Sequence, residues 1–190
     1  MFPSPESPMS PDIALLHAIN GLASQFPALN TLMIAITRFG VLLMVLAVVP
    51  LWWARSQRDR ERHLATSAGL AFIGGLMLNQ LVLLFVQRAR PYTDGLSHLL
   101  IAPSADPSFP SDHATAVTAI AATFLLQRRF RSGGAFALAG LLVMLSRVYV
   151  GTHYPSDVLG GLVTGCLAAL VVRGFYTREC WLNRRLVRLL

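Results

Sequence analysis

Long apolar runs alternate with short polar connections along most of this chain. The runs cover about 32–54, 64–87, 113–126, 135–150 and 156–172. At 1.5 Å per residue, the first two would reach roughly 33–36 Å as helices, and about 30 Å of hydrocarbon must be crossed. The last two are just long enough. The pattern therefore predicts an all-α integral membrane protein, a bundle of about five transmembrane helices.

The third run is shorter than the others. Its sequence, HATAVTAIAATFLL, has 14 residues, which as a helix would span only about 21 Å. Such a length is more typical of a helix buried among other helices than of a span that faces lipid. If this run does cross the membrane, His113 at its start must lie below the headgroups in a polar cavity.

The N-terminal part differs from the rest. Residues 1–11 carry prolines at positions 3, 5, 8 and 11 and no basic residue, so we expect neither a helix nor a signal peptide there. An amphipathic stretch over 12–24, with Asp12 as its N-cap, is too short to span, and we predict an interfacial helix. The chain reads as one domain over 1–190, with 173–190 as a cytoplasmic tail.

Composition and charge agree with a membrane protein. Hydrophobic residues make up 54% of the chain, charged residues only 13%, and all 16 basic residues other than histidine are arginine. The net charge of +7 raises the question of nucleic acid. We exclude nucleic acid as a partner because the arginines cluster at the ends of apolar runs and not along one polar face. The sequence indicates membrane lipids as partners and is silent on protein partners.

The arginines are divided unequally between the two sides of the predicted bundle. Twelve fall in the connections 55–63 and 127–134 and in the tail 173–190, whereas Arg88, Arg90 and Arg147 lie on the opposite side. By the positive-inside rule, the side with three arginines faces the periplasm or the cell exterior. Arg38 lies inside the first run, where it either snorkels to the interface or forms a buried ion pair.

Three short motifs on the sparsely charged side carry the candidate chemistry. They are Arg90-Pro91, Pro110-Ser111-Asp112-His113, and Ser146-Arg147 followed by His153 and Asp157. Two guanidinium groups can neutralise a phosphoryl group, one imidazole can attack phosphorus and a second can protonate the leaving oxygen. Ser111 is also a good N-cap, and a helix N-terminus is an anion site. The motifs predict a phosphate-processing site at the membrane surface.

The sequence offers little for a metal site or a disulfide. It has no CxxC, HExxH or acidic calcium-loop pattern, so we predict no metal and no cofactor. Cys166 falls in the middle of a predicted span and Cys180 in the tail. A disulfide between them is excluded by depth and compartment.

The motifs resemble the signature blocks of the type 2 phosphatidic acid phosphatase superfamily, which includes membrane lipid phosphatases and vanadium haloperoxidases. The three blocks are ARP, SFPSDHA and SRVYVGTHYPSD, within a resemblance that covers 75–165. The segments LNQL at 78–81, RARPY at 88–92 and SADPSFPSDHATA at 104–116 resemble more specifically the bacitracin-resistance type of undecaprenyl-diphosphate phosphatase. Such an enzyme resides in the bacterial inner membrane and acts on a polyprenyl diphosphate lipid.

Chemistry and resemblance together imply a role for each residue. His153 would form a phosphohistidine, Asp157 would accept a hydrogen bond from its other ring nitrogen, and His113 would protonate the leaving group and later activate water. The phosphoryl oxygens would be held by side chains and by the backbone N–H groups at 111–113. That phosphate-binding set comprises Arg90, Ser111, Asp112 and Arg147, with Arg88 assigned to the second phosphate of a diphosphate.

One position departs from the superfamily pattern. A lysine usually stands seven residues before the arginine of the RP motif, and here that position is Leu83. Gln80 and Gln87 would share its helical face and could serve as neutral donors. The undecaprenyl branch resembles this chain in lacking the lysine.

Three functions stay open from the sequence. The first is an undecaprenyl-diphosphate phosphatase that recycles the cell-wall lipid carrier. The second is a phosphatase for another lipid, such as phosphatidylglycerol phosphate or phosphatidic acid. The third is a non-catalytic lipid-binding or transport protein, against which the complete catalytic set argues.

His98 is interpreted as an ordinary loop residue or a headgroup contact.

Overall fold

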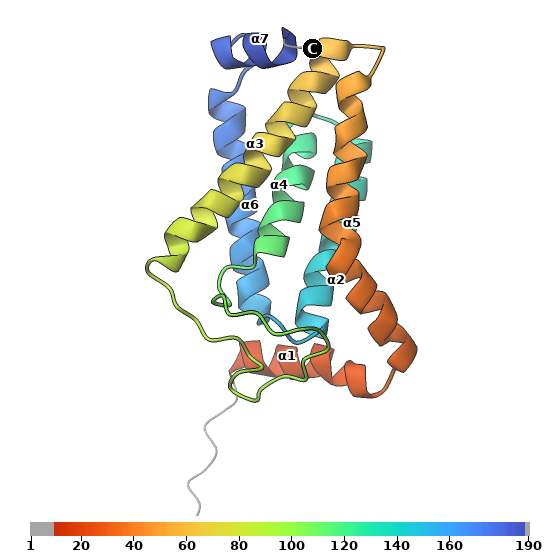
Figure 1. Ribbon diagram of the computed structural model, residues 1–190, viewed down its shortest axis with the longest axis vertical. Helices are drawn as coiled ribbons and strands as arrows, with labels where there is room; N and C mark the ends of the chain where they lie inside the picture. The colour runs from red at the N-terminus through yellow and green to blue at the C-terminus, as the bar shows by residue number, and fades with distance from the viewer. Residues whose placement is uncertain (1–9, 189–190) are drawn as a thin grey trace, which may run out of the picture.

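The regular elements of this protein are helical throughout residues 10–188, the part that the computed structural model describes (Figure 1). In chain order they are α1 (Pro11–Asn20), the short turn η1 (Gly21–Ser24), α2 (Pro27–Val48), the turn η2 (Val49–Trp53), α3 (Arg58–Leu83), α4 (Asp112–Leu126), α5 (Phe130–Tyr149), α6 (Pro155–Phe175) and α7 (Trp181–Arg188).

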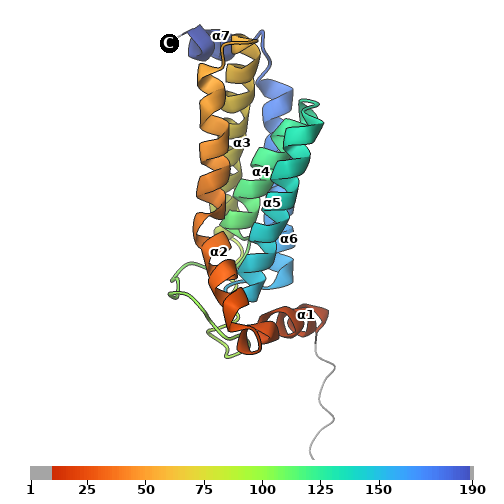
Figure 2. The same ribbon diagram turned by 90° about the vertical axis from the view of Figure 1, so that its right-hand side faces the viewer.

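The expected membrane bundle is confirmed. Four segments are long and apolar enough to cross a membrane, namely α2 with η2, α3, α5 and α6, and α4 is a shorter apolar helix. The helix α4 packs against α3, α5 and α6 at the centre of the bundle (Figures 1 and 2). Most of its residues are buried, which agrees with the expectation that the third run forms a buried helix.

Glycines let α6 approach α4 closely. A Cβ atom at Gly165 would lie 2.6 Å from the carbonyl oxygen of Thr115, and one at Gly161 would lie 2.5 Å from that of Ser111. Only a residue without a side chain fits at such a separation. The approach continues to the start of both helices, where the Ser111 N–H donates to the carbonyl oxygen of Asp157 at 3.0 Å.

The N-cap of the N-terminal helix lies two residues earlier than the sequence pattern predicts. Ser10, and not Asp12, is the N-cap: its Oγ accepts a hydrogen bond from the Ile13 N–H at 3.4 Å, and Pro11 lies in the first turn. The other residues of the segment predicted to lack structure, 1–9, lie outside the described part. With η1, the helix α1 lies across one end of the bundle (Figure 2), as an interfacial helix would.

The second predicted run is shifted. The helix α3 begins at Arg58, so part of the polar connection is helical, and it ends at Leu83, before Arg88 and Pro91. A loop over 84–111 then crosses the same end of the bundle as α1 (Figure 1). The segment predicted as a tail contains α7.

The expected donors in place of the missing lysine are not where the sequence put them. Gln80 is exposed, and Gln87 lies beyond the end of α3, where its amide donates to the carbonyl oxygen of Leu83. Asn79 is the buried polar residue of this helix turn, and its amide donates to Asp112 Oδ1 at 2.7 Å and to Thr115 Oγ1 at 2.8 Å.

The two ends of the bundle differ in chemistry. The starts of α4 and α6, the end of α5 and the 84–111 loop meet at the end covered by α1, so all three motifs come together there. The arginine-rich connections and α7 lie at the opposite end (Figure 1). Arg38 is exposed, with its guanidinium 5.7 Å from the ring centre of Phe39, which excludes the buried ion pair and favours snorkelling.

Candidate active site

His153 lies between α5 and α6 and is only 3% exposed. Its Nδ1 is 2.8 Å from the carbonyl oxygen of Ser108, so Nδ1 carries the proton and Nε2 has the free lone pair. Burial lowers the pKa of His153 to about 4, and the nearby Asp157 carboxylate opposes this shift only in part. The imidazole is therefore neutral near pH 7, as a nucleophile must be.

Asp157 holds the imidazole less directly than expected. Its Oδ2 lies 3.6 Å from His153 Nδ1, beyond hydrogen-bond distance. The same oxygen accepts a hydrogen bond from Ser108 Oγ at 2.5 Å and one from the Tyr154 N–H at 2.8 Å. Asp157 thus positions Ser108, and the carbonyl oxygen of Ser108 sets the tautomer of His153. Ser108 belongs to the SFPSDHA block, but its type alone gave no sign of this role.

Arg88 has a different environment from the one expected. Its Nη1 donates to Ser156 Oγ at 2.6 Å and to Asp157 Oδ1 at 2.8 Å, and its Nη2 donates to Asp12 Oδ2 at 2.7 Å. The guanidinium carbon also lies 3.8 Å from the ring centre of Tyr154. With two carboxylates as partners, Arg88 is placed to orient Asp157.

Asp12 brings α1 into this network, and sequence reasoning missed it. Its Oδ1 accepts a hydrogen bond from the Ser156 N–H at 2.9 Å, and its Oδ2 accepts one from Ser156 Oγ at 2.6 Å. Burial alone would raise the pKa of Asp12, but the hydrogen bonds from Ser156 and Arg88 lower it below the usual value. Because Ser10 caps α1, the Asp12 carboxylate is free to fasten α1 to the start of α6.

Two further arginines flank His153 and differ in how they are held. Arg90 donates from Nε to the carbonyl oxygen of Asp106 at 2.8 Å, and its Nη1 lies 3.3 Å from His153 Nε2. Arg147 is 7% exposed, and its Nε has no hydrogen-bond partner among the described residues. A buried N–H group without an acceptor is costly, so the arrangement favours an anion at Arg147.

The N-terminus of α4 supplies a second orphaned group. Ser111 stands at the N-cap position, as expected, but its Oγ makes no capping bond and is buried without a partner. Since its N–H is bonded to Asp157, only the first-turn N–H groups from Asp112 onward lack an acceptor. The Asp112 side chain is exposed and accepts from Asn79, so Asp112 can contribute its N–H and not its carboxylate.

His113 approaches from another helix. It is the second residue of α4, it contacts the backbone of Thr37 in α2, and it lies within electrostatic range of Arg90, Arg147 and His153. The two histidines thus come from different segments and face the same pair of arginines. One can attack a phosphoryl group while the other exchanges a proton with the oxygen that leaves or enters.

Asn20 ties the outer loop to the site, and nothing in its sequence context pointed to it. Its amide donates to the carbonyl oxygens of His98 at 2.9 Å and Tyr149 at 2.7 Å, and its Oδ1 accepts from the His98 N–H at 2.7 Å. His98 is therefore held through its backbone, while its side chain is exposed.

Over residues 10–188, no group of three or more His, Cys, Asp or Glu residues could hold a metal ion.

Comparison with known proteins gives a consistent result. Residues 63–181 match the model of the PAP2 superfamily. The chain is 36% identical over 153 residues to undecaprenyl-diphosphatase BcrC of Bacillus subtilis, covering 80% of this chain and 78% of that protein. It is 30% identical over 165 residues to the putative undecaprenyl-diphosphatase YbjG of Escherichia coli, covering 85% and 82%.

Solved structures agree on the fold. The PAP2-type phosphatidylglycerolphosphate phosphatase from Bacillus subtilis superposes with a TM-score of 0.68 at 26% identity, covering 90% of this chain and 87% of that one. LpxE of Aquifex aeolicus superposes with a TM-score of 0.72 at 21% identity, covering 90% and 100%. This chain therefore belongs to the PAP2 superfamily, and it is a membrane-embedded phosphatase that acts on lipid phosphates.

Proposed function

We propose that this enzyme hydrolyses undecaprenyl diphosphate to undecaprenyl phosphate and inorganic phosphate through a phosphohistidine on His153. The observation that carries the proposal is the pair of buried orphaned groups, Arg147 Nε and Ser111 Oγ, in the same site as a neutral His153. The relative from Bacillus subtilis is named an undecaprenyl-diphosphatase, and the relative from Escherichia coli is named a putative one.

The reaction needs two displacements at phosphorus. In the first, His153 Nε2 attacks the terminal phosphorus, an N–P bond forms, and the bridging P–O bond breaks to release undecaprenyl phosphate. In the second, a water attacks the phosphohistidine while His113 takes its proton, and inorganic phosphate leaves. Arg90, Arg147 and the α4 N-terminus stabilise the charge on the transferred oxygens.

The leaving group favours a diphosphate substrate. A lipid diphosphate releases a phosphate monoester, whose second pKa is about 6, so it departs with little protonation. A lipid monophosphate releases an alkoxide, which requires a full proton donor. Because Leu83 replaces the usual lysine and Arg88 is bound to carboxylates, the site has fewer free cations and suits the easier leaving group.

A second candidate substrate is phosphatidylglycerol phosphate. The chain is 31% identical over 159 residues to phosphatidylglycerophosphatase B of Bacillus subtilis, and a structural neighbour is a phosphatidylglycerolphosphate phosphatase. Its leaving group is an alkoxide, so the substrate panel below separates it from the first candidate.

The site faces the periplasm or cell exterior in this proposal, and the protein resides in the bacterial inner membrane. The support is the gathering of arginine at the end of the bundle opposite the catalytic residues, which the positive-inside rule assigns to the cytoplasm. Undecaprenyl phosphate would then be regenerated on the outer leaflet, where the lipid carrier is recycled.

The substrate assignment is tested by kcat/KM for purified enzyme in detergent on undecaprenyl diphosphate, phosphatidic acid and phosphatidylglycerol phosphate. We expect the diphosphate to be preferred by about tenfold or more, since a better leaving group lowers the barrier by at least ~1.4 kcal/mol. We also expect His113→Ala to impair the monophosphates more than the diphosphate. A wild-type preference for phosphatidylglycerol phosphate would place the second candidate first.

The covalent step is tested with His153→Ala, which should lower kcat by about 10³-fold or more because no other side chain is placed to attack phosphorus. Acid-labile phosphate should be trapped on the wild-type protein after an acid-free quench and be absent from the variant. His98→Ala serves as the control, because this side chain is exposed in the outer loop, and it should retain wild-type turnover. Full activity in His153→Ala would refute the phosphohistidine.

The positioning role of Arg88 and Asp12 is tested with Asp12→Asn. Losing one carboxylate should loosen Arg88 and Asp157, so we expect kcat to fall about tenfold with little change in KM, because misplacement affects the reacting geometry. Asp12→Glu should recover part of the loss. Asp94→Asn removes an exposed carboxylate of the 84–111 loop and should have a much smaller effect. An equal loss in both asparagine variants would contradict the role.

The orientation is tested by cysteine labelling in intact cells, in a background that lacks Cys166 and Cys180. Ala105→Cys lies in the exposed loop beside the site, and Ser56→Cys is exposed at the opposite end. An impermeant thiol reagent should label the first from outside and the second only after lysis. The reverse pattern would place the active site in the cytoplasm.

A further inference from the structure

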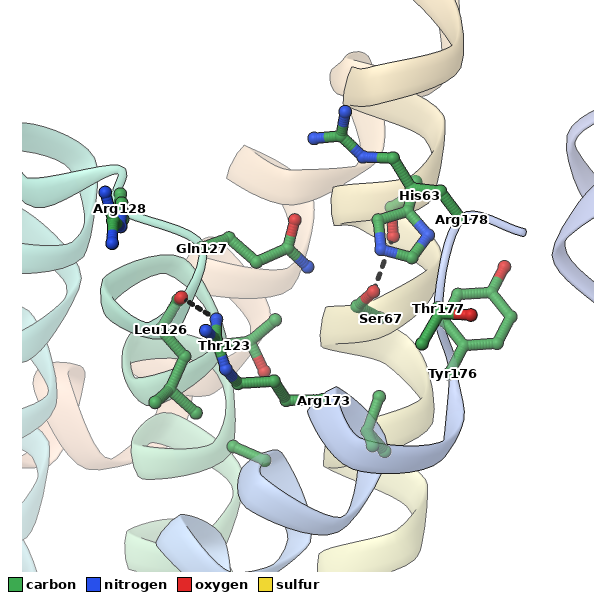
Figure 3. Close-up of a pocket in the computed structure, with 12 residues that line it drawn as sticks. His63, Ser67, Thr123, Leu126, Gln127, Arg128, Arg173, Tyr176, Thr177 and Arg178 are labelled. Atoms are coloured by element: carbon green, nitrogen blue, oxygen red, sulfur yellow. Dashed lines mark hydrogen bonds between the residues drawn. The ribbon is translucent and has the colours of Figure 1, made fainter. Parts of the chain in front are cut away.

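A polar cavity lies at the end of the bundle opposite the catalytic residues, and Figure 3 shows the residues that line it. It has a volume of about 310 Å³ and is formed by the ends of α3, α4 and α6 and the segment that follows α6. Its wall is made by His63, Ser67, Thr123, Leu126, Gln127, Arg128, Ala169, Val172, Arg173, Tyr176, Thr177 and Arg178.

The charged groups in this wall are all cations. Arg128, Arg173 and Arg178 line the cavity, and no aspartate or glutamate does. Glu61, the acidic residue buried in α3 near this end, forms an ion pair with Arg129 outside the cavity. Asp59 borders a neighbouring hollow that shares Arg178. The cavity therefore gathers positive charge that no carboxylate in its own wall balances.

One cationic side chain of the wall and the backbone of a second arginine are held by hydrogen bonds. Arg173 donates from Nη1 to the carbonyl oxygen of Leu126, the last residue of α4. The carbonyl oxygen of Arg178 accepts a hydrogen bond at 2.8 Å from Asn183, which is 6% exposed. Asn183 Oδ1 in turn lies 2.9 Å from both His63 Nδ1 and the Tyr176 hydroxyl. Buried polar contacts therefore anchor the backbone of this wall, and the side chains of Arg128, Arg173 and Arg178 are exposed on it.

The donors that can reach a ligand are N–H groups. The Ser67 and Thr123 hydroxyls donate to carbonyl oxygens of their own helices, those of His63 and Ala119, each at 2.7 Å. In the view of Figure 3, the Gln127 amide projects between the guanidinium groups of Arg173 and Arg178. Planar guanidinium groups with several N–H donors match the oxygens of a phosphate group.

We propose that this cavity binds a phosphate group, supplied by an anionic phospholipid headgroup or by inorganic phosphate. The cavity lies where the spanning helices end, at the level of lipid headgroups, and basic pockets between membrane helices bind phosphorylated headgroups at this depth. The site is separate from the catalytic residues and does not depend on which lipid phosphate the enzyme hydrolyses.

The test measures ligand binding to full-length, delipidated protein by native mass spectrometry in a non-ionic detergent. The probes are phosphatidylglycerol, which is a phosphodiester, phosphatidylcholine, and inorganic phosphate. The cavity variants are Arg178→Gln, which removes no described side-chain hydrogen bond, and Arg173→Gln/Arg178→Gln. The matched control is Arg55→Gln/Arg131→Gln, which removes two exposed charges at the same end outside the cavity. Thermal unfolding and turnover confirm that each variant is folded.

We expect the double cavity variant to weaken phosphatidylglycerol binding about tenfold, because two charge-assisted contacts are lost. Arg178→Gln should weaken this binding less, and the control variant should change it by less than about twofold. Phosphatidylcholine should bind weakly to all. A selective loss for phosphatidylglycerol identifies a headgroup site, and a selective loss for inorganic phosphate identifies a free-anion site, since phosphate held at the catalytic end is common to all variants. Equal weakening in cavity and control variants, or none in either, would overturn the proposal.

Discussion

The buried carboxylate of Asp157 is the point on which the candidate site depends. It is fully enclosed, so its charge must be balanced where it lies. Ser108 and the Tyr154 N–H bind one oxygen, and Arg88 binds the other. Through Ser108 the carboxylate orients the imidazole of His153, and through Arg88 it is joined to Asp12. One charge therefore connects a helix start, a loop and the N-terminal helix.

Close helix packing explains how these segments meet. The glycines of α6 bring its backbone against α4, which sets the N-terminus of α4 beside Asp157 and leaves Ser111 Oγ without a partner. Membrane helices associate through such small-residue contacts because lipid offers no hydrophobic gain for association. The same contact that stabilises the bundle thus preorganises the donors for a phosphoryl group.

Charge is arranged differently at the two ends of the bundle. At the catalytic end, Arg88 is neutralised by carboxylates, whereas the Nε of the buried Arg147 has no hydrogen-bond partner among the described residues. At the opposite end, arginines surround a polar cavity whose wall contains no acid. In both places guanidinium groups face a polar site, and a phosphate group is the ligand whose geometry fits them.

The sequence by itself determined the fold class, the helical runs and the three motifs, because apolar length and the spacing of reactive residues are local properties. It misplaced the cap of α1 and the end of α3, and it did not show that Arg88 pairs with two carboxylates, because boundaries and partners depend on what lies across the bundle. The roles of Asp12, Ser108 and Asn20 were decided only by tertiary structure. Ordinary polar residues become specific when packing brings distant segments within hydrogen-bond distance and removes water as a competing partner.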